Sequence, residues 1–203
     1  MILSDLYSSY SQLLRNPTMK IKLLIFIFLS NIIYSQNNYF ELKTFKTSEI
    51  PTIETKFKSK KFIQTQKIVY FDEESNVSPP INYVRKATDN FPTATIEYFY
   101  SAKDSIVKSV TIDWKLNIDE KLSQQDKVEK YNASFDNLIL SMTNILGIPN
   151  PNQGNLTEIE SPVANDKTIN YERKVVWNTN GKTIITTIVW AENHGHQMIT
   201  TIK

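Results

Sequence analysis

The stretch "SQQDKVEKYNASFDNLILSMTNILGIP", residues 123–149, carries the strongest structural pattern in this sequence. Its apolar side chains recur at steps of three and four residues, at Val128, Tyr131, Phe135, Leu138, Met142, Ile145 and Leu146. On an α-helix this spacing gathers the apolar side chains in one stripe and leaves the opposite face polar. The pattern therefore predicts a long amphipathic helix over residues 124–146.

Both ends of this predicted helix carry end signals. Ser123, followed three residues later by Asp126, approximates a capping box, in which side chains bond to the free backbone N–H groups of the first turn. Gly147 can adopt the left-handed conformation that often ends a helix, and Pro149 prevents its continuation.

Segments rich in β-branched and aromatic residues lie on both sides of the helix. The predicted strands are residues 62–72, 93–100, 105–116, 171–177, 182–191 and 196–203, with a further edge strand at 39–45. Alternation of apolar and polar residues in 105–116 is typical of a strand with one buried face. Asn180-Gly181 predicts a tight hairpin turn because both residues tolerate positive φ angles. Residues 76–82 and 149–167, which contain prolines, are predicted loops.

The order of these elements favours an α+β fold. Strands come first, then one long helix, then three strands, so the alternation that produces parallel βαβ units is absent. We therefore expect a mostly antiparallel sheet of about five to seven strands, with the long amphipathic helix packed on one face.

The most apolar run of the chain lies near its beginning, in "TMKIKLLIFIFLSNIIYSQNN", residues 18–38. Two lysines precede seven consecutive apolar residues, 23–29, and the small residue Ser35 follows. This layout is that of a secretory signal peptide, and the run is shorter than the roughly 20 residues that a membrane-spanning helix needs. We expect cleavage after Ser35. The alternative is an uncleaved N-terminal anchor, because Ile33 fits the cleavage rule poorly.

This interpretation divides the chain into four parts. Residues 1–18 precede a complete signal that has its own methionine, and we interpret them as a start-site artefact. Residues 19–35 are the predicted signal peptide, and residues 36–62 a partly ordered lead-in. Residues 63–203 are predicted to form a single α+β domain, which is long enough to bury a core without disulfides.

Composition excludes several classes of function. The chain has no cysteine, so disulfides, thiolate metal sites and cysteine nucleophiles are excluded. The whole chain has 23 basic and 21 acidic residues, and residues 36–203 contain equal numbers of the two. Nucleic-acid binding usually leaves a basic excess, so we expect no nucleic-acid partner. The one local exception is "KFKSKKF", residues 56–62, which is typical of a solvated face and less often of a surface for an anionic glycan or lipid.

Only two histidines are present, in "ENHGHQ", residues 192–197. His194, His196 and Glu192 resemble the two histidines and one acid of many catalytic zinc sites. The competing interpretation is a polar hairpin turn around Gly195, and we favour it because no further ligand is indicated elsewhere. We therefore predict no metal and no other cofactor.

Carboxylate pairs leave one enzymatic alternative open. Acidic pairs occur at Asp72–Glu74, Asp119–Glu120 and Glu158–Glu160, and glycosidases use two acids about 5–10 Å apart. Such pairs in loops are mostly solvated. No G-x-S-x-G motif and no phosphate-binding glycine loop is present.

Three tryptophans are the candidate binding residues: Trp114, Trp177 and Trp190. They could form a platform that stacks on a sugar, but each lies inside a β pattern, where core packing is the competing interpretation. A separate short motif, Asp104-Ser105-Ile106, resembles the O-glycosylation signal of some bacterial periplasms and lies at a predicted hairpin turn.

The sequence thus favours a non-catalytic binding domain with a protein or glycan partner. The abundance of Asn, Lys, Ile and Ser, and a signal that ends at Ser-Gln, resemble exported proteins of AT-rich bacteria. We expect a periplasmic or extracellular protein that does not span the membrane once the signal is cleaved. The alternatives are an inhibitor or immunity-type partner of a secreted enzyme, and an envelope hydrolase that uses loop carboxylates.

Overall fold

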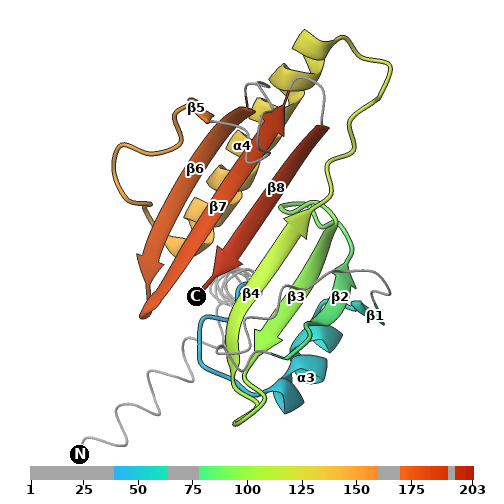
Figure 1. The fold of residues 1–203 in the computed structure, drawn as a ribbon, viewed down its shortest axis with the longest axis vertical. Coiled ribbons are helices and arrows are strands. Elements are labelled where there is room, and N and C mark those ends of the chain that lie inside the picture. Colours follow the sequence, from blue (N-terminus) through green and yellow to red (C-terminus); the bar gives the residue numbers. More distant parts are fainter. Residues whose placement is uncertain (1–38, 64–77, 160–169, 192–194) are drawn as a thin grey trace, which may run out of the picture. The chain divides into compact units, whose positions relative to one another are not determined.

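The structure is a computed structural model. It describes residues 39–63, 78–159, 170–191 and 195–203. The chain divides into two compact units, Met1–Glu41 and Leu42–Lys203, and every labelled helix and strand of Figure 1 belongs to the second unit. The predicted signal peptide, residues 19–35, and the residues before it lie outside the described residues.

The described part of the second unit contains one 3₁₀ helix, two α-helices and eight strands. In chain order these are η1 (Thr47–Glu49), α3 (Ile50–Lys56), β1 (Lys60–Phe62), β2 (Ile81–Arg85), β3 (Ala94–Tyr100), β4 (Val107–Trp114), α4 (Gln124–Leu146), β5 (Thr157–Ile159), β6 (Asn170–Thr179), β7 (Lys182–Ala191) and β8 (Gly195–Ile202). The strands form one antiparallel sheet in the order β1-β2-β3-β4-β8-β7-β6-β5. The architecture is therefore α+β, as predicted.

The two halves of the sheet have the same order of elements. α3 precedes β1 to β4, and α4 precedes β5 to β8, so each half is a helix followed by four antiparallel strands. The last strand of each half lies at the centre of the sheet, where β4 pairs with β8 from Val110↔Ile202 to Trp114↔Met198. β1 and β5 form the two edges, and each is only three residues long. Short edge strands limit pairing with other chains.

The helix predicted over residues 124–146 is present with the same bounds, as α4. Its N-cap is Ser123, whose Oγ accepts a hydrogen bond from the backbone N–H of Asp126 at 3.2 Å. Gly147 ends the helix with a φ angle of +87°. The buried residues of α4 are Tyr131, Phe135, Leu138 and Met142, all members of the predicted stripe. Apolar spacing therefore identified both the helix and its buried side.

The hairpin predicted at Asn180-Gly181 joins β6 to β7. Both residues have positive φ angles, 51° and 71°, and Thr179 pairs with Lys182 across the two-residue turn. Positive φ at both central positions is the type I′ geometry that matches the twist of the adjoining strands.

The hairpin of β3 and β4 contains one irregularity. Phe99 pairs with Ser109, but the next pair is Tyr100 with Val107, so Lys108 is the extra residue of a β-bulge. A bulge shifts the alternation of side chains by one residue. This explains why Val107 and Val110 are both buried although Lys108 between them is exposed.

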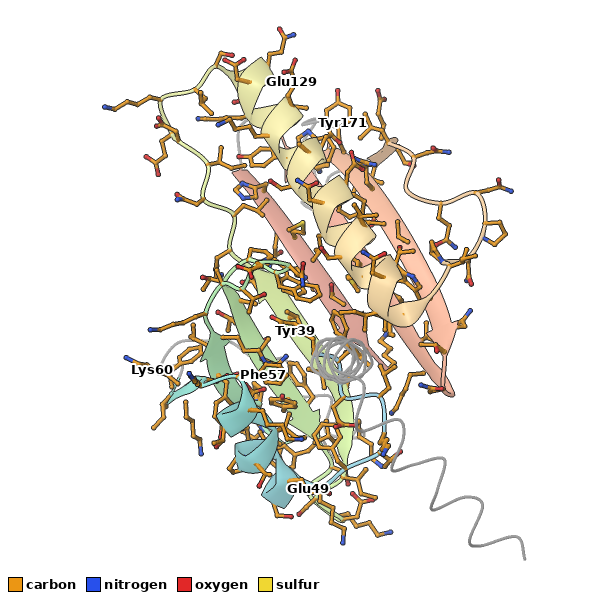
Figure 2. The ribbon with its side chains drawn as sticks, turned by 180° about the vertical axis from the view of Figure 1, so that it is seen from behind. Tyr39, Glu49, Phe57, Lys60, Glu129 and Tyr171 are labelled. Atoms are coloured by element: carbon orange, nitrogen blue, oxygen red, sulfur yellow. The ribbon has the colours of Figure 1, made fainter. Side chains whose placement is uncertain are left out.

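α3 and α4 contact the same face of the sheet (Figures 1 and 2). Glu54 of α3 binds Arg85 of β2, and Met142 of α4 accepts a hydrogen bond from Thr186 of β7. Directly opposed residues of neighbouring antiparallel strands point to the same face. A chain of directly opposed pairs leads across the sheet from one contact to the other: Arg85 with Ala94, Ala94 with Trp114, Trp114 with Met198, and Met198 with Ile188. Ile188 lies two residues from Thr186 on the same strand, so Arg85 and Thr186 point to the same face.

The strand count exceeds the five to seven predicted, because short strands were missed. β2 begins at Ile81, inside the predicted loop 76–82, and β5 lies inside the predicted loop 149–167. Strands of three to five residues are too short to show alternation, and Pro79-Pro80 obscured the start of β2. Most of the predicted strand 62–72 lies outside the described residues.

The lead-in predicted up to residue 62 is also different in the structure. Residues 50–56 form α3 and residues 60–62 form β1. Pro51 suggested irregular structure, but proline is well tolerated in the first turn of a helix, where its missing N–H would have had no partner.

The edge strand predicted at residues 39–45 is absent. Beside it, Lys46 forms only an isolated bridge with Ile106. Phe45 is buried, and its ring lies 5.9 Å from the ring of Tyr98. The Phe45 side chain is therefore part of the core. The sequence pattern does not distinguish an aromatic residue buried from a loop from one that lies in a strand.

No helix within the described ranges is both long enough and apolar enough to cross a membrane.

Candidate functional site

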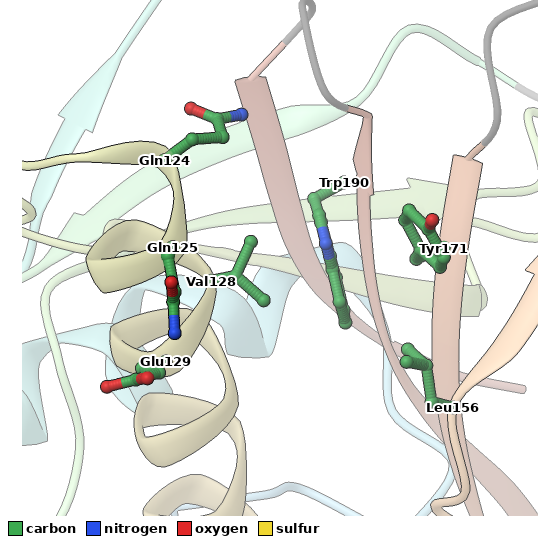
Figure 3. A pocket seen from close by; sticks show the side chains of 7 residues that line it. All are labelled: Gln124, Gln125, Val128, Glu129, Leu156, Tyr171 and Trp190. Carbon is green, nitrogen blue, oxygen red and sulfur yellow. The ribbon is translucent and has the colours of Figure 1, made fainter.

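An apolar pocket lies where the first turns of α4 meet the ends of β6 and β7 (Figure 3). Its volume is about 370 Å³, and the residues that line it are Gln124, Gln125, Val128, Glu129, Leu156, Tyr171 and Trp190. Cavities of a few hundred cubic ångströms with mainly apolar walls and a few polar groups are typical of small-molecule sites. This pocket is therefore the candidate binding site.

The pocket's walls come from separate elements. Tyr171 and Trp190 are directly opposed on β6 and β7, and their rings stack at 5.8 Å with an angle of 27° between the planes. Val128 faces Trp190 from α4, while Leu156, which is 55% exposed, lies in the loop before β5 (Figure 3). Stacked rings on paired strands are held by the sheet, so this wall exists before any ligand binds.

The sheet side of the pocket carries two polar atoms, the Tyr171 hydroxyl and the Trp190 indole N–H, and the helical side carries three polar side chains. Gln124, Gln125 and Glu129 are exposed and project from the start of α4. Glutamine side chains donate and accept hydrogen bonds, whereas an ionised carboxylate only accepts them. The arrangement can hold a ligand with an apolar body and a polar, hydrogen-bond-donating end.

Of the three predicted binding tryptophans, Trp190 alone lines this pocket. Trp114 is 2% exposed, stacks on Phe91 at 5.7 Å and donates from Nε1 to Thr200 Oγ1 at 2.9 Å. Trp177 is 1% exposed and donates to the carbonyl oxygen of Gly147 at 3.0 Å. Both rings are packed inside the core and do not line the pocket, whereas Trp190, which is itself only 3% exposed, contributes to the pocket wall.

A small polar network satisfies the buried hydroxyl groups under α4. Thr186 and Thr200 are fully buried, and their Oγ1 atoms are 2.8 Å apart. Thr186 also donates to Met142 Sδ at 3.2 Å, and Thr200 accepts from Trp114. Because buried polar groups are costly unless they are paired, these contacts make both threonines compatible with the core.

His196 lies against Tyr131 of α4, with the ring centroids 4.0 Å apart. Burial lowers the pKa of His196 below its ordinary value of 6.5, although the nearby charge of Asp113 acts in the opposite direction. His194 lies outside the described residues. Within the part of the chain that the structure describes, no cluster of three histidines or carboxylates could hold a metal ion.

A buried ion pair joins α3 to the sheet. Arg85 Nη2 lies 2.6 Å from Glu54 Oε1, and Arg85 Nε lies 3.2 Å and 3.1 Å from the two carboxylate oxygens. Tyr98 OH donates to Glu54 Oε1, and Ser59 Oγ donates to Oε2 at 2.5 Å. The Arg85 guanidinium also lies 4.0 Å from the centroid of the Phe57 ring.

The electrostatics of this cluster follow from its burial. Glu54, Arg85 and Tyr98 are at most 3% exposed. Burial alone would raise the pKa of Glu54, but the hydrogen bonds and charge of Arg85, helped by Ser59 and Tyr98, hold it below its ordinary value. Burial raises the pKa of Tyr98, and the Glu54 charge adds to that increase, so the phenol remains a donor. The cluster has a structural role, because a ligand cannot reach it.

The remaining predicted groups are scattered. Asp119, Glu120 and Glu158 are exposed, while Asp72–Glu74 and Glu160 lie outside the described residues. Ser105 is exposed in the turn between β3 and β4, with a φ angle of 57°, next to Asp104, whose Oδ1 accepts a hydrogen bond from the Ile106 N–H at 3.0 Å.

A second cavity of about 480 Å³ lies between the β2–β3 connection and the middle of α4. It is lined by Ala87, Thr88, Asp89, Asn90, Phe91, Pro92, Thr93, Lys115, Leu116, Asn117, Ser134, Asn137 and Leu138. Its wall is mostly loop, and a larger share of that wall is polar than in the pocket beside Trp190.

Sequence reasoning missed most of the candidate site. Val128 belonged to the predicted stripe and Trp190 to the candidate tryptophans, but Leu156 lay in a predicted loop and Tyr171 in a strand without any marked role. Alternation did place Tyr171 and Trp190 on strands of one hairpin, which is the signal that could have paired them.

The described residues form an α+β fold with one antiparallel sheet and an apolar cavity where helix and sheet meet. Comparison with family models, curated proteins and solved structures finds no match for this chain.

Proposed function

We propose that this protein is an exported, non-catalytic binding domain and that the pocket beside Trp190 is its ligand site. The observation that supports this proposal is the stacked Tyr171–Trp190 wall, which faces Val128 across a cavity of about 370 Å³. The ligand has an apolar body that fills the cavity and a polar end that bonds to Gln125 or Glu129 at its rim. Export follows from the apolar run and small residue that end at Ser35.

In this proposal α4 is packed along one face of the sheet and serves as the fixed wall of the pocket. Phe135 and Met142 are fully buried, which ties the helix to the sheet two to four turns beyond the pocket. A wall that is ordered without ligand reduces the entropic cost of binding.

Titration with the neutral fluorescent probe N-phenyl-1-naphthylamine tests the site. We expect saturable fluorescence enhancement with a Kd of about 10 μM, which corresponds to about −7 kcal/mol. Leu156→Trp places a larger side chain at the mouth of the pocket and should weaken binding at least tenfold.

Ile148→Trp is the matched control, because Ile148 is 93% exposed and does not line the pocket. It should leave the Kd unchanged. Equal effects of the two substitutions, or no saturable binding by the unsubstituted chain, would show that the pocket is not a ligand site.

A further inference from the structure

A row of lysines lies at one edge of the sheet. Lys56 is in the last turn of α3, Lys58 is in the following turn, and Lys60 and Lys61 are in the edge strand β1 (Figure 2 labels Lys60). All four side chains are exposed. No carboxylate of the described residues forms a salt bridge with any of them.

This local charge contrasts with the rest of the chain, which is nearly neutral. Lysines on an edge strand discourage pairing with another sheet, and this role can explain Lys60 and Lys61. It does not explain Lys56 and Lys58, which lie outside the strand. Four like charges within six residues repel one another, so their arrangement suits an anionic partner.

The backbone that carries the lysines is fixed. Lys58 has a φ angle of 51°, and its N–H donates to the carbonyl of Thr55 at 3.0 Å. The Ser59 N–H donates to the carbonyl of Glu54 at 3.1 Å, and the Ser59 hydroxyl donates to the same residue's carboxylate. Because Arg85 anchors Glu54 in the core, the turn presents its lysines in a preorganised arrangement.

An exposed aliphatic side chain follows the lysines directly. Ile63 is 85% exposed, one of the four most exposed large apolar side chains of the described residues. Basic side chains attract the headgroups of an anionic bilayer, and an adjacent aliphatic side chain can enter the boundary between headgroups and acyl chains. A soluble polyanion would use the charges but gain nothing from Ile63.

We propose that the lysine row, Lys56, Lys58, Lys60 and Lys61, together with Ile63, docks this edge of the protein on an anionic phospholipid surface. The docking is peripheral and does not involve the pocket beside Trp190. It is therefore independent of the proposed ligand site.

Sedimentation with lipid vesicles tests this docking. The full chain is mixed with vesicles of phosphatidylcholine alone or of phosphatidylcholine and phosphatidylglycerol in equal amounts. Salt is varied from about 0.1 M to about 0.5 M, which shortens the Debye length from about 10 Å to about 4 Å. The readout is the ratio of partition coefficients for the two vesicle types, compared between variants that all carry the same apolar run at residues 21–34.

The ratio should depend on the lysine row. A lysine near an anionic surface strengthens binding about fivefold, so the variant K56Q/K58Q/K60Q/K61Q should lower the ratio at least about tenfold at low salt. The control K103Q/K121Q/K130Q/K174Q removes the same charge from exposed positions elsewhere and should keep the ratio.

Ile63→Ser separates insertion from charge attraction. It should weaken partition into anionic vesicles up to about tenfold while the salt dependence stays the same. The variant K56R/K58R/K60R/K61R keeps the charge and should bind as the unsubstituted chain does. It is the control for misfolding caused by four substitutions in this segment.

Three results would overturn the proposal. The first is a ratio near one for the unsubstituted chain. The second is an equal loss in the lysine-row variant and its control, which would mean that only net charge matters. The third is retention on a heparin column without preference for anionic vesicles, which would assign the row to a soluble polyanion.

Discussion

Arg85 of β2 and Glu54 of α3 form a buried ion pair with an Nη2–Oε1 distance of 2.6 Å. The second half of the fold has a related but more exposed pair, because Arg173 of β6 lies 2.7 Å from Asp136 of α4, whose side chain is 62% exposed. Each guanidinium also lies over a phenylalanine ring of its own half, Phe57 or Phe135. The second strand of each half is thus tied to the preceding helix by an arginine–carboxylate ion pair.

The buried pair predicts a large loss of stability when one partner is removed. Glu54→Gln should lower the free energy of unfolding by about 3–5 kcal/mol, because it leaves the Arg85 charge buried without compensation. The double variant Glu54→Gln/Arg85→Met should cost less than the sum of the single variants. Urea unfolding of all three measures this coupling, and strict additivity would contradict it.

The same pair predicts a stability loss in acid. The pKa of Glu54 is lower in the folded state than its ordinary value of 4.5, so the unfolded chain binds the proton more readily. The contribution of Glu54 is therefore complete above pH 4.5 and is lost as the pH falls through its folded pKa. Urea midpoints measured in steps from neutral to acidic pH should fall less steeply below 4.5 in Glu54→Gln than in the unsubstituted chain.

His196 predicts a second pH dependence, at higher pH. Its pKa is lowered by burial against Tyr131, so the folded state favours the neutral ring. As the pH falls below 6.5, the unfolded chain takes up the proton first and stability declines. NMR titration should give a His196 midpoint below 6.5, and His196→Phe should remove this part of the decline. A midpoint at or above 6.5 would contradict the burial argument.

The buried stripe of α4 predicts what holds the domain together without disulfides. Phe135 is 0% exposed, and Phe135→Ala should cost about 3–5 kcal/mol through the cavity that it leaves. Asn137 is exposed on the same helix, and Asn137→Ala should change stability by no more than about 0.5 kcal/mol. If urea unfolding shows a cost below about 1 kcal/mol for Phe135→Ala, the stripe is not the core face.

The histidine pair predicts an absence of tight metal binding. His196 belongs to β8 and its ring lies against Tyr131, so zinc titration by calorimetry should show no stoichiometric binding tighter than about 1 μM, or about −8 kcal/mol. Chelators should leave the unfolding midpoint unchanged. Tight zinc binding that is lost in His196→Phe would show that His196 belongs to a metal site.

The signal-like segment predicts a mature N-terminus at Gln36, within two residues on either side. The small residue Ser35 follows the apolar run, as a cleavage site requires. Intact-mass analysis of the exported protein checks this directly. A mass that still includes residues 20–29 would indicate an uncleaved anchor.

Local patterns were sufficient for part of the fold. The spacing of Phe135, Leu138 and Met142 predicted both the bounds of α4 and its buried side, because a helix repeats every 3.6 residues whatever surrounds it. Asn180-Gly181 predicted the β6–β7 hairpin, because positive φ is a property of the two residues themselves. β2 and β5 were not predicted, because strands of five and three residues are too short to show the alternation of apolar and polar side chains.

Tertiary structure alone decided the buried ion pair and the pocket. Glu54 lies 31 residues from Arg85 and 44 from Tyr98, and these residues meet only because α3 covers the strands that carry them. The pocket likewise requires Val128, Leu156 and Trp190 to converge from a helix, a loop and a strand. Burial energies depend on which surfaces meet. That depends on the strand order, in which β4 pairs with β8 across 80 residues of intervening chain.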